Sequence, residues 1–200
     1  MSISNKLGGG SEISVDSLPD LIGIGGTFAS GKDSLACALV DRFGFTHVST
    51  GDMVRIEAMK RYGNIERPTL TTVAVELRNE SGSGVLAKKA LELPRPLVVS
   101  GIRTAGEVKT LKSAGGVMVF IDAEPGTRFK RMKSRQRDSE TKLTFEEFLA
   151  REQNEISGAK TDADQNIGAV REMSDLTLDN NGTYEEFIDG AINKLCGVER

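Results

Sequence analysis

Short apolar stretches alternate with longer amphipathic stretches along most of this chain. Five short apolar runs, several of them rich in β-branched residues, predict buried strands at residues 21–25, 45–49, 97–100, 117–121 and 176–178. Apolar residues at helical spacing predict helices at 34–43, 53–62, 71–80, 85–93, 107–113, 125–137, 145–157 and 184–195. Strands separated by helices are typical of a parallel sheet that is covered on both faces. The pattern therefore predicts a three-layer α/β domain.

The two ends of this pattern set the expected domain limits. Residues 1–20 are rich in Ser and Gly and have no helical or strand period, so we expect a flexible tail followed by one domain at 21–200. Pro68 is expected to separate two helices, and Pro94 to follow the end of a third.

Composition narrows the class of protein. The chain has 200 residues, and about 48% of them are apolar when Gly is counted and Tyr is not, which is an ordinary globular composition. No apolar run is long enough to span a bilayer and no secretion signal opens the chain, so we expect a cytoplasmic protein without a membrane partner. With 26 Lys and Arg against 29 Asp and Glu, the net charge of −3 argues against nucleic acid as a partner. A site for a polyanion would have to be local.

Histidine and cysteine limit the metal chemistry. His47 is the single histidine, so a site with two histidines is excluded. Cys37 and Cys196 lack the spacing of metal ligands and are expected to be reduced and buried.

The strongest chemical signal follows the first predicted strand and opens the first predicted helix. It consists of Gly26, Thr27, Phe28, Ala29, Ser30, Gly31, Lys32 and Asp33, followed by Ser34. This spacing is typical of a phosphate-binding loop, in which backbone N–H groups surround a polyphosphate and the lysine approaches its β and γ oxygens. The alternative is a glycine-rich turn before a helix. Asp33 stands where Ser or Thr usually contacts Mg²⁺; a carboxylate can hold Mg²⁺ but adds negative charge. We expect ATP and Mg²⁺ here.

A second motif, at residues 49–55, follows the second strand and reads Ser-Thr-Gly-Asp-Met-Val-Arg. It resembles the nucleoside monophosphate kinases of the adenylate kinase type, whose second strand ends in Ser-Thr-Gly-Asp-Met-Leu-Arg. The resemblance implies that Thr50 and Arg55 hold the acceptor nucleotide, and a guanidinium does fit a phosphate well. Alternatively, Thr50 or Asp52 caps a helix and Arg55 is a surface residue.

A third segment, Ser100 to Thr104, looks like the Asp-Gly-Phe-Pro-Arg-Thr segment of the same family. The resemblance implies that Arg103 binds the acceptor phosphate, whereas Ser100 replaces an acidic residue that helps to position Mg²⁺. Glu107 stands where adenylate kinases carry a glutamine that reads the base. A carboxylate suits a base edge rich in donors, such as that of guanine or cytosine. The alternative is an exposed glutamate at the start of a helix.

Basic residues are concentrated in residues 128–137. The six are Arg128, Lys130, Arg131, Lys133, Arg135 and Arg137. Similar arginines in the family lead into a lid and clamp the transferring phosphoryl group, which implies this role for Arg131, Arg135 and Arg137, with Arg151 after the lid. Lys130 and Lys133 are assigned to a solvated helix face.

Arg78, together with Arg67, is a further candidate for the acceptor site. A surface ion pair of Arg78 with Glu76 or Glu80 is the alternative.

Taken together, the resemblance implies a P-loop NTPase fold with a five-stranded parallel sheet in the order 2-3-1-4-5. An acceptor-binding insertion is expected at about 53–96 and a lid at about 133–150. The reaction would be phosphoryl transfer from ATP to a nucleoside or deoxynucleoside monophosphate, by a monomer or homodimer with small-molecule nucleotide substrates. The turn at 179–183 also resembles dephospho-coenzyme A kinases and uncharacterised kinase-like P-loop proteins of archaea. Dephospho-coenzyme A kinase activity, or nucleotide binding with little kinase activity, are the alternatives.

Overall fold

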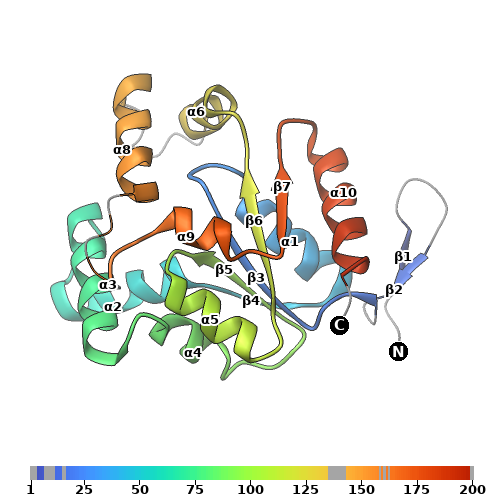
Figure 1. Ribbon diagram of the computed structural model, residues 1–200, viewed down its shortest axis with the longest axis horizontal. Helices are drawn as coiled ribbons and strands as arrows, with labels where there is room; N and C mark the ends of the chain where they lie inside the picture. Colours follow the sequence, from blue (N-terminus) through green and yellow to red (C-terminus); the bar gives the residue numbers. More distant parts are fainter. Residues whose placement is uncertain are drawn as a thin grey trace.

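A five-stranded parallel sheet forms the centre of the protein. The computed structural model describes residues 4–6, 12–14, 17–134, 143–157, 159, 161 and 163–198. The strands are β3 (Leu21–Gly26), β4 (Thr46–Ser49), β5 (Leu97–Ile102), β6 (Val117–Asp122) and β7 (Leu176–Asp179). They lie in the order β4-β5-β3-β6-β7, with every neighbouring pair parallel (Figure 1). The predicted order 2-3-1-4-5 is confirmed.

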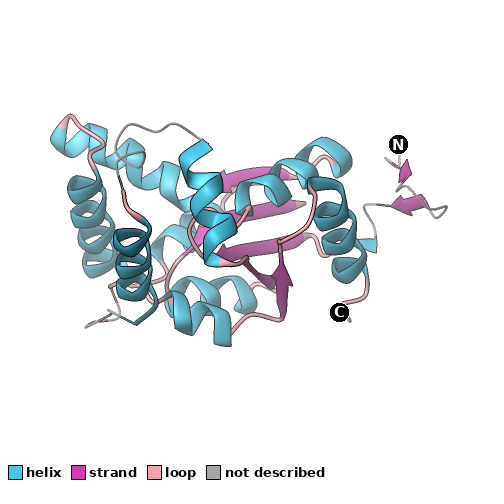
Figure 2. Ribbon diagram, turned by 90° about the horizontal axis from the view of Figure 1, so that it is seen from above, coloured by secondary structure: helices cyan, strands magenta, loops and turns pink. Residues whose placement is uncertain are grey.

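Helices cover both faces of this sheet, as Figure 1 and Figure 2 show. Successive strand residues point to opposite faces, so that Ile22 and Ile24 pack with α1 (Lys32–Phe43) and α10 (Tyr184–Cys196). On the other face, Leu97 and Val99 pack with α4 (Val85–Ala90), α5 (Ala105–Ser113) and α9 (Ile167–Glu172). The strands are short and buried on both sides, which explains their continuous apolar runs.

Two groups of helices lie beyond the sheet. The insertion between β4 and β5 contains α2 (Thr50–Tyr62) and α3 (Arg67–Ser81), which share a small core of their own with α4. After β6, α6 (Pro125–Ser134) and α8 (Phe145–Ser157) pack through a cluster that includes Met132 and Phe148. This cluster also contains Ala29, which lies in the loop between β3 and α1. Among the described helices, none is long and apolar enough to cross a bilayer.

Some elements differ from the sequence prediction. Helix α3 begins at Arg67, with Pro68 in its first turn, because a proline at that position breaks no helical hydrogen bond. The prediction missed α9, which has six residues and is too short to establish a period; Asn166 caps it by accepting a hydrogen bond from the N–H of Ala169.

The expected tail also differs in part. Two short strands within it, β1 (Ser4–Lys6) and β2 (Glu12–Ser14), pair antiparallel near the end of α10. Leu18 is buried in the main core, so the packed domain begins before Leu21. Both cysteines are free, but the expected burial is wrong for Cys37, which is exposed, and only partial for Cys196.

Candidate active site

The loop between β3 and α1 has the conformation of an anion-binding turn. Ala29 (φ 59°) and Gly31 (φ 101°) are both left-handed, and α1 begins at Lys32 directly after them. Left-handed residues beside a helix N-terminus turn successive N–H groups into one concave surface. A side chain at Gly31 would bring its Cβ to 2.2 Å from Nδ2 of Asn180, so this position requires glycine.

The side chains of Lys32 and Ser30 bear on what this loop can bind. The Nζ of Lys32 donates hydrogen bonds to the carbonyl oxygens of Gly26, at 3.1 Å, and of Thr27, at 2.5 Å. Ser30 is fully buried, and its hydroxyl has no hydrogen-bond partner within the part of the chain that the structure describes. A buried hydroxyl without a partner is costly, and an oxygen of a bound phosphate would satisfy it.

Side chains at the ends of β6 and β7 hold the loop in place. The hydroxyl of Thr27 donates to Oδ1 of Asp122 at 2.7 Å, and Nδ2 of Asn180 donates to the carbonyl oxygen of Ser30 at 2.8 Å. Sequence reasoning missed both residues. Their position within two residues of the ends of predicted strands was the available signal, because the carboxyl ends of parallel strands meet at one edge of the sheet.

A pocket of about 340 Å³ adjoins this loop. Arg131 enters it from α6 and donates to the backbone oxygen of Asn180 at 2.8 Å and to its side-chain oxygen at 3.3 Å. The lining residues are Gly31, Ser34, Arg131, Ser134, Asn180, Tyr184 and Phe187. Because Asn180 fixes the guanidinium of Arg131 through two hydrogen bonds, this planar group can stack on a planar ring in the pocket.

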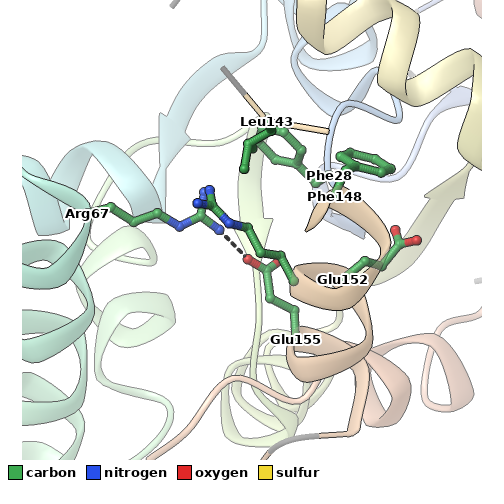
Figure 3. A pocket seen from close by; sticks show the side chains of 7 residues that line it. Phe28, Arg67, Leu143, Phe148, Glu152 and Glu155 are labelled. Carbon is green, nitrogen blue, oxygen red and sulfur yellow. Dashed lines mark hydrogen bonds and ion pairs between the residues drawn. The ribbon is translucent and has the colours of Figure 1, made fainter. Parts of the chain in front are cut away.

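The other predicted clamp residues divide into two groups. Arg135 and Arg137 lie outside the described residues. Arg151 lies on α8 and lines a second, smaller pocket, which also includes Phe28 of the loop and Arg67 of α3 (Figure 3).

Arg128, a further basic residue of α6, is buried and connects α6 to α8. It forms a bidentate ion pair with Glu152 and donates a hydrogen bond to the carbonyl oxygen of Ala123 at 2.6 Å.

The second motif lies at the carboxyl end of β4. The hydroxyl of Thr50 is buried and donates to the carbonyl oxygen of Gly101 at 2.6 Å, which joins the ends of β4 and β5. Arg55 is exposed and forms an ion pair with Asp52 at 2.5 Å. The second turn of α2 thus presents a guanidinium to solvent near the end of β5.

Arg103 follows β5 and points towards α8. One of its terminal nitrogens donates to Oε1 of Gln165 at 2.7 Å and lies 3.9 Å from Oε2 of Glu155. Burial lowers the pKa of the Arg103 guanidinium, and the carboxylate of Glu155 acts in the opposite direction. Because an arginine begins from such a high pKa, Arg103 remains a cation.

Arg78 and Glu107 contact each other in the interior. Their side chains are 2% and 0% exposed and form an ion pair at 3.3 Å. The other oxygen of Glu107 accepts from the N–H groups of Arg103, at 2.8 Å, and Thr104, at 3.1 Å. Glu107 is therefore neither an exposed residue nor open to a base, and the predicted base reading has no support in these contacts.

The surface pair suggested for Arg78 is wrong as well. Glu76 and Glu80 both pair with Arg61 instead, at 3.2 and 2.9 Å. Arg78 instead donates to the carbonyl oxygen of Ala163 at 3.3 Å. It connects the insertion to the loop before α9.

Two residues bear on metal binding. Asp33 is exposed in the first turn of α1, next to Lys32. Ser100 is 1% exposed, and its hydroxyl lies 2.9 Å from Nε2 of His47. Within the described ranges, His, Cys, Asp and Glu side chains form no cluster of three that could hold a metal. Any cation here would depend on few protein ligands.

Comparison with known proteins assigns the chain to a family. A family model described as an AAA domain matches residues 25–147, which include the whole phosphate loop. The chain belongs to this family. A UPF0200 protein of Thermococcus kodakarensis is 33% identical over 184 residues, which span 83% of this chain and 95% of that protein. The chain is thus also a UPF0200 protein.

Solved structures share the fold at low sequence identity. Shikimate kinase from Acinetobacter baumannii, in complex with shikimate, has a TM-score of 0.57 and 16% identity, covering 88% of this chain and 92% of that one. TT1252 from Thermus thermophilus has a TM-score of 0.55 and 21% identity, covering 92% and 100%. The protein has a P-loop kinase-like fold.

Proposed function

We propose that this protein transfers the γ-phosphoryl group of ATP to a nucleoside or deoxynucleoside monophosphate, giving ADP and a nucleoside diphosphate. The observation that carries the proposal is the loop at residues 26–33, with its left-handed turns, its lysine and the buried hydroxyl of Ser30, which has no hydrogen-bond partner among the described residues. Such a loop suits a polyphosphate.

On the donor side, the polyphosphate of ATP would lie over the loop and its adenine in the adjoining pocket, against Arg131. Lys32 would leave the carbonyl oxygens of the loop for the β and γ oxygens, where a cation stabilises the charge of the moving group.

Asp33 is the residue that would hold Mg²⁺. Its carboxylate is exposed one residue after Lys32, and carboxylate oxygens are suitable Mg²⁺ ligands. One protein ligand fits an ion that takes its other ligands from water and phosphates. When bound, Mg²⁺ neutralises charge on the phosphates.

On the acceptor side, Thr50, Arg55 and Arg103 lie at the ends of the two neighbouring strands β4 and β5. We assign them to the acceptor nucleotide, with Arg103 on its phosphate. The predicted clamp arginines Arg135, Arg137 and Arg151 would stabilise the transferring group, whereas Arg131 would contact the adenine. A phosphate acceptor is already ionised at neutral pH, so the reaction needs no general base.

One observation favours a second candidate, a nucleotide-binding protein with little kinase activity. At Ser100, where the related kinases carry an acidic residue, a buried hydroxyl is bonded to His47. This end of β5 therefore supplies no carboxylate.

A single assay separates the candidates. Purified protein is incubated with ATP, Mg²⁺ and, in turn, each nucleoside monophosphate, each deoxynucleoside monophosphate and dephospho-coenzyme A, and products are resolved by anion-exchange chromatography. Formation of a nucleoside diphosphate supports the proposal. Phosphorylation of dephospho-coenzyme A alone, or ATP binding by calorimetry without any turnover, would contradict it.

A further inference from the structure

Glu155 joins two arginines that come from separate parts of the chain. Its Oε1 accepts a hydrogen bond from Arg67, the first residue of α3, at 2.6 Å (Figure 3). Its Oε2 lies 3.9 Å from Arg103, which follows β5. One carboxylate on α8 thus sits between the insertion and the end of a central strand.

This carboxylate also lies close to the phosphate loop. The guanidinium carbon of Arg67 is 5.9 Å from the ring centre of Phe28, a residue of the loop. Phe28, Arg67 and Glu155 line one pocket, together with Arg151, which is one turn before Glu155 on the same helix. The pocket is therefore next to the place where the γ-phosphate of ATP is proposed to lie.

The charged side chains that line this pocket are two arginines, Arg67 and Arg151, and two carboxylates, Glu152 and Glu155. Glu152 is already paired with the buried Arg128. Arg151 has no hydrogen-bond or ion-pair partner among the residues that the structure describes. Arg67 and Arg103 therefore share the carboxylate of Glu155.

We propose that Glu155 is an internal counter-ion that an anionic group of the acceptor displaces, and that Arg67, already a candidate from the sequence, binds this group once Glu155 has left it. The proposal rests on the proposed function, since it places the reacting end of the acceptor in this pocket. It adds how the acceptor is recognised: its phosphate binds Arg67 and Arg103 in place of the Glu155 carboxylate.

The contacts of Glu155 are weak enough for an anionic ligand to displace its carboxylate from the arginines. The side chains of Glu155 and Arg67 are 21% and 50% exposed, and an ion pair between partly exposed groups contributes little stability, so it breaks at low cost. A phosphate carries more charge and more oxygens than a carboxylate and can bind two guanidinium groups at once. An uncharged acceptor lacks the negative charge needed to replace the Glu155 carboxylate on the two guanidinium groups. Glu155 therefore selects for anionic acceptors.

The alternative is that the bond between Glu155 and Arg67 only holds the insertion against α8. The two accounts predict opposite effects of removing the charge on Glu155. If Glu155 competes with the ligand, Glu155→Gln makes anion binding tighter. If it only holds the two parts together, the same change leaves anion binding equal or weaker.

The experiment is calorimetric titration of the full chain with inorganic phosphate, after saturation with the β,γ-imido analogue of ATP. We expect Glu155→Gln to bind phosphate about tenfold more tightly than the wild type and Arg67→Gln about tenfold more weakly, as for one charged hydrogen bond. Glu146→Gln, an exposed position on the same helix, and Arg42→Gln, on α1, are the matched controls and should match the wild type.

Each result decides one point. Equal or weaker phosphate binding by Glu155→Gln, or unchanged binding by Arg67→Gln, overturns the inference. Should Glu155→Gln fail to fold, Arg67→Gln decides alone, because Arg67 is half exposed at a helix start. Failure of the imido analogue to bind overturns the proposed function instead, and the phosphate titration without it still tests Glu155.

Discussion

The two regions that we propose to bind the phosphoryl donor and the acceptor, called the donor half and the acceptor half below, are built in different ways. The donor half is a run of consecutive residues, 26–33, whose conformation depends on its own glycines and on two anchors, Asp122 and Asn180. The acceptor half is assembled from ion pairs between distant residues, such as Arg78 with Glu107 and Arg67 with Glu155. A local motif fixes the first, whereas only the folded chain brings together the second.

Because of this difference, we expect substitutions in the donor half to change activity and substitutions in the acceptor half to change the stability of the fold. In the donor half, Lys32 is partly exposed and its ammonium donates hydrogen bonds to two carbonyl oxygens of the loop, so we expect its loss to affect function much more than the fold. In the acceptor half, Arg78 and Glu107 are buried together, so their loss should affect the fold. The predictions below test this division, beginning with the largest effect.

Lys32→Met should lower the rate of phosphoryl transfer by at least about 10³-fold, because it removes the cation nearest the moving phosphoryl group. The melting temperature should stay at the wild-type value. Steady-state kinetics and differential scanning calorimetry measure the two quantities. Lys130→Met, an exposed position on α6, serves as the control. Transfer at the wild-type rate in Lys32→Met would remove the phosphate-loop assignment.

Glu107→Gln should destabilise the fold by about 3 kcal/mol, because the buried Arg78 loses its anionic partner. Urea denaturation measures the free energy of unfolding, with Glu92→Gln as an exposed control. The preference among nucleoside monophosphates should not change. A shift of that preference towards adenine with unchanged stability would restore Glu107 as a base-reading residue.

Asn180→Ala should weaken ATP binding about tenfold, because both Ser30 and Arg131 lose a hydrogen bond to this side chain. Calorimetric titration with ATP measures the change. Asn181→Ala is the matched control, since the neighbouring amide only accepts a hydrogen bond from the N–H of Glu124. Equal effects of the two substitutions would argue that Asn180 has no special role in the donor half.

The fold could be predicted almost completely from the pattern of apolar residues. All five strands of the sheet and the predicted helices that fall on described residues have counterparts, because burial on two sides leaves continuous apolar runs in the strands and one apolar stripe on each helix. The misses have local causes. Pro68 indicates a break between two helices in the sequence pattern, although it lies in the first turn of α3. Helix α9 has only six residues, which is too short for a helical period to be recognised in the sequence.

The candidate site was predictable in its residue types but not in its contacts. The phosphate loop is a contiguous motif, so its position followed directly from spacing. Glu107 forms an ion pair with Arg78, which is 29 positions away in the sequence. Glu155 pairs with Arg67, which is 88 positions away. No local pattern encodes which of several arginines a given carboxylate meets. That choice depends on how the insertion and α8 pack.

The most direct test of the central claim follows the phosphorus atoms themselves. ³¹P NMR spectra are recorded over time on the wild-type protein with ATP, Mg²⁺ and the nucleoside monophosphate that gives the highest turnover. We expect the γ-phosphate signal of ATP to fall while the β-phosphate signal of a new nucleoside diphosphate rises equally, without inorganic phosphate. Accumulation of inorganic phosphate alone, or an unchanged spectrum for every nucleoside monophosphate, would contradict the account.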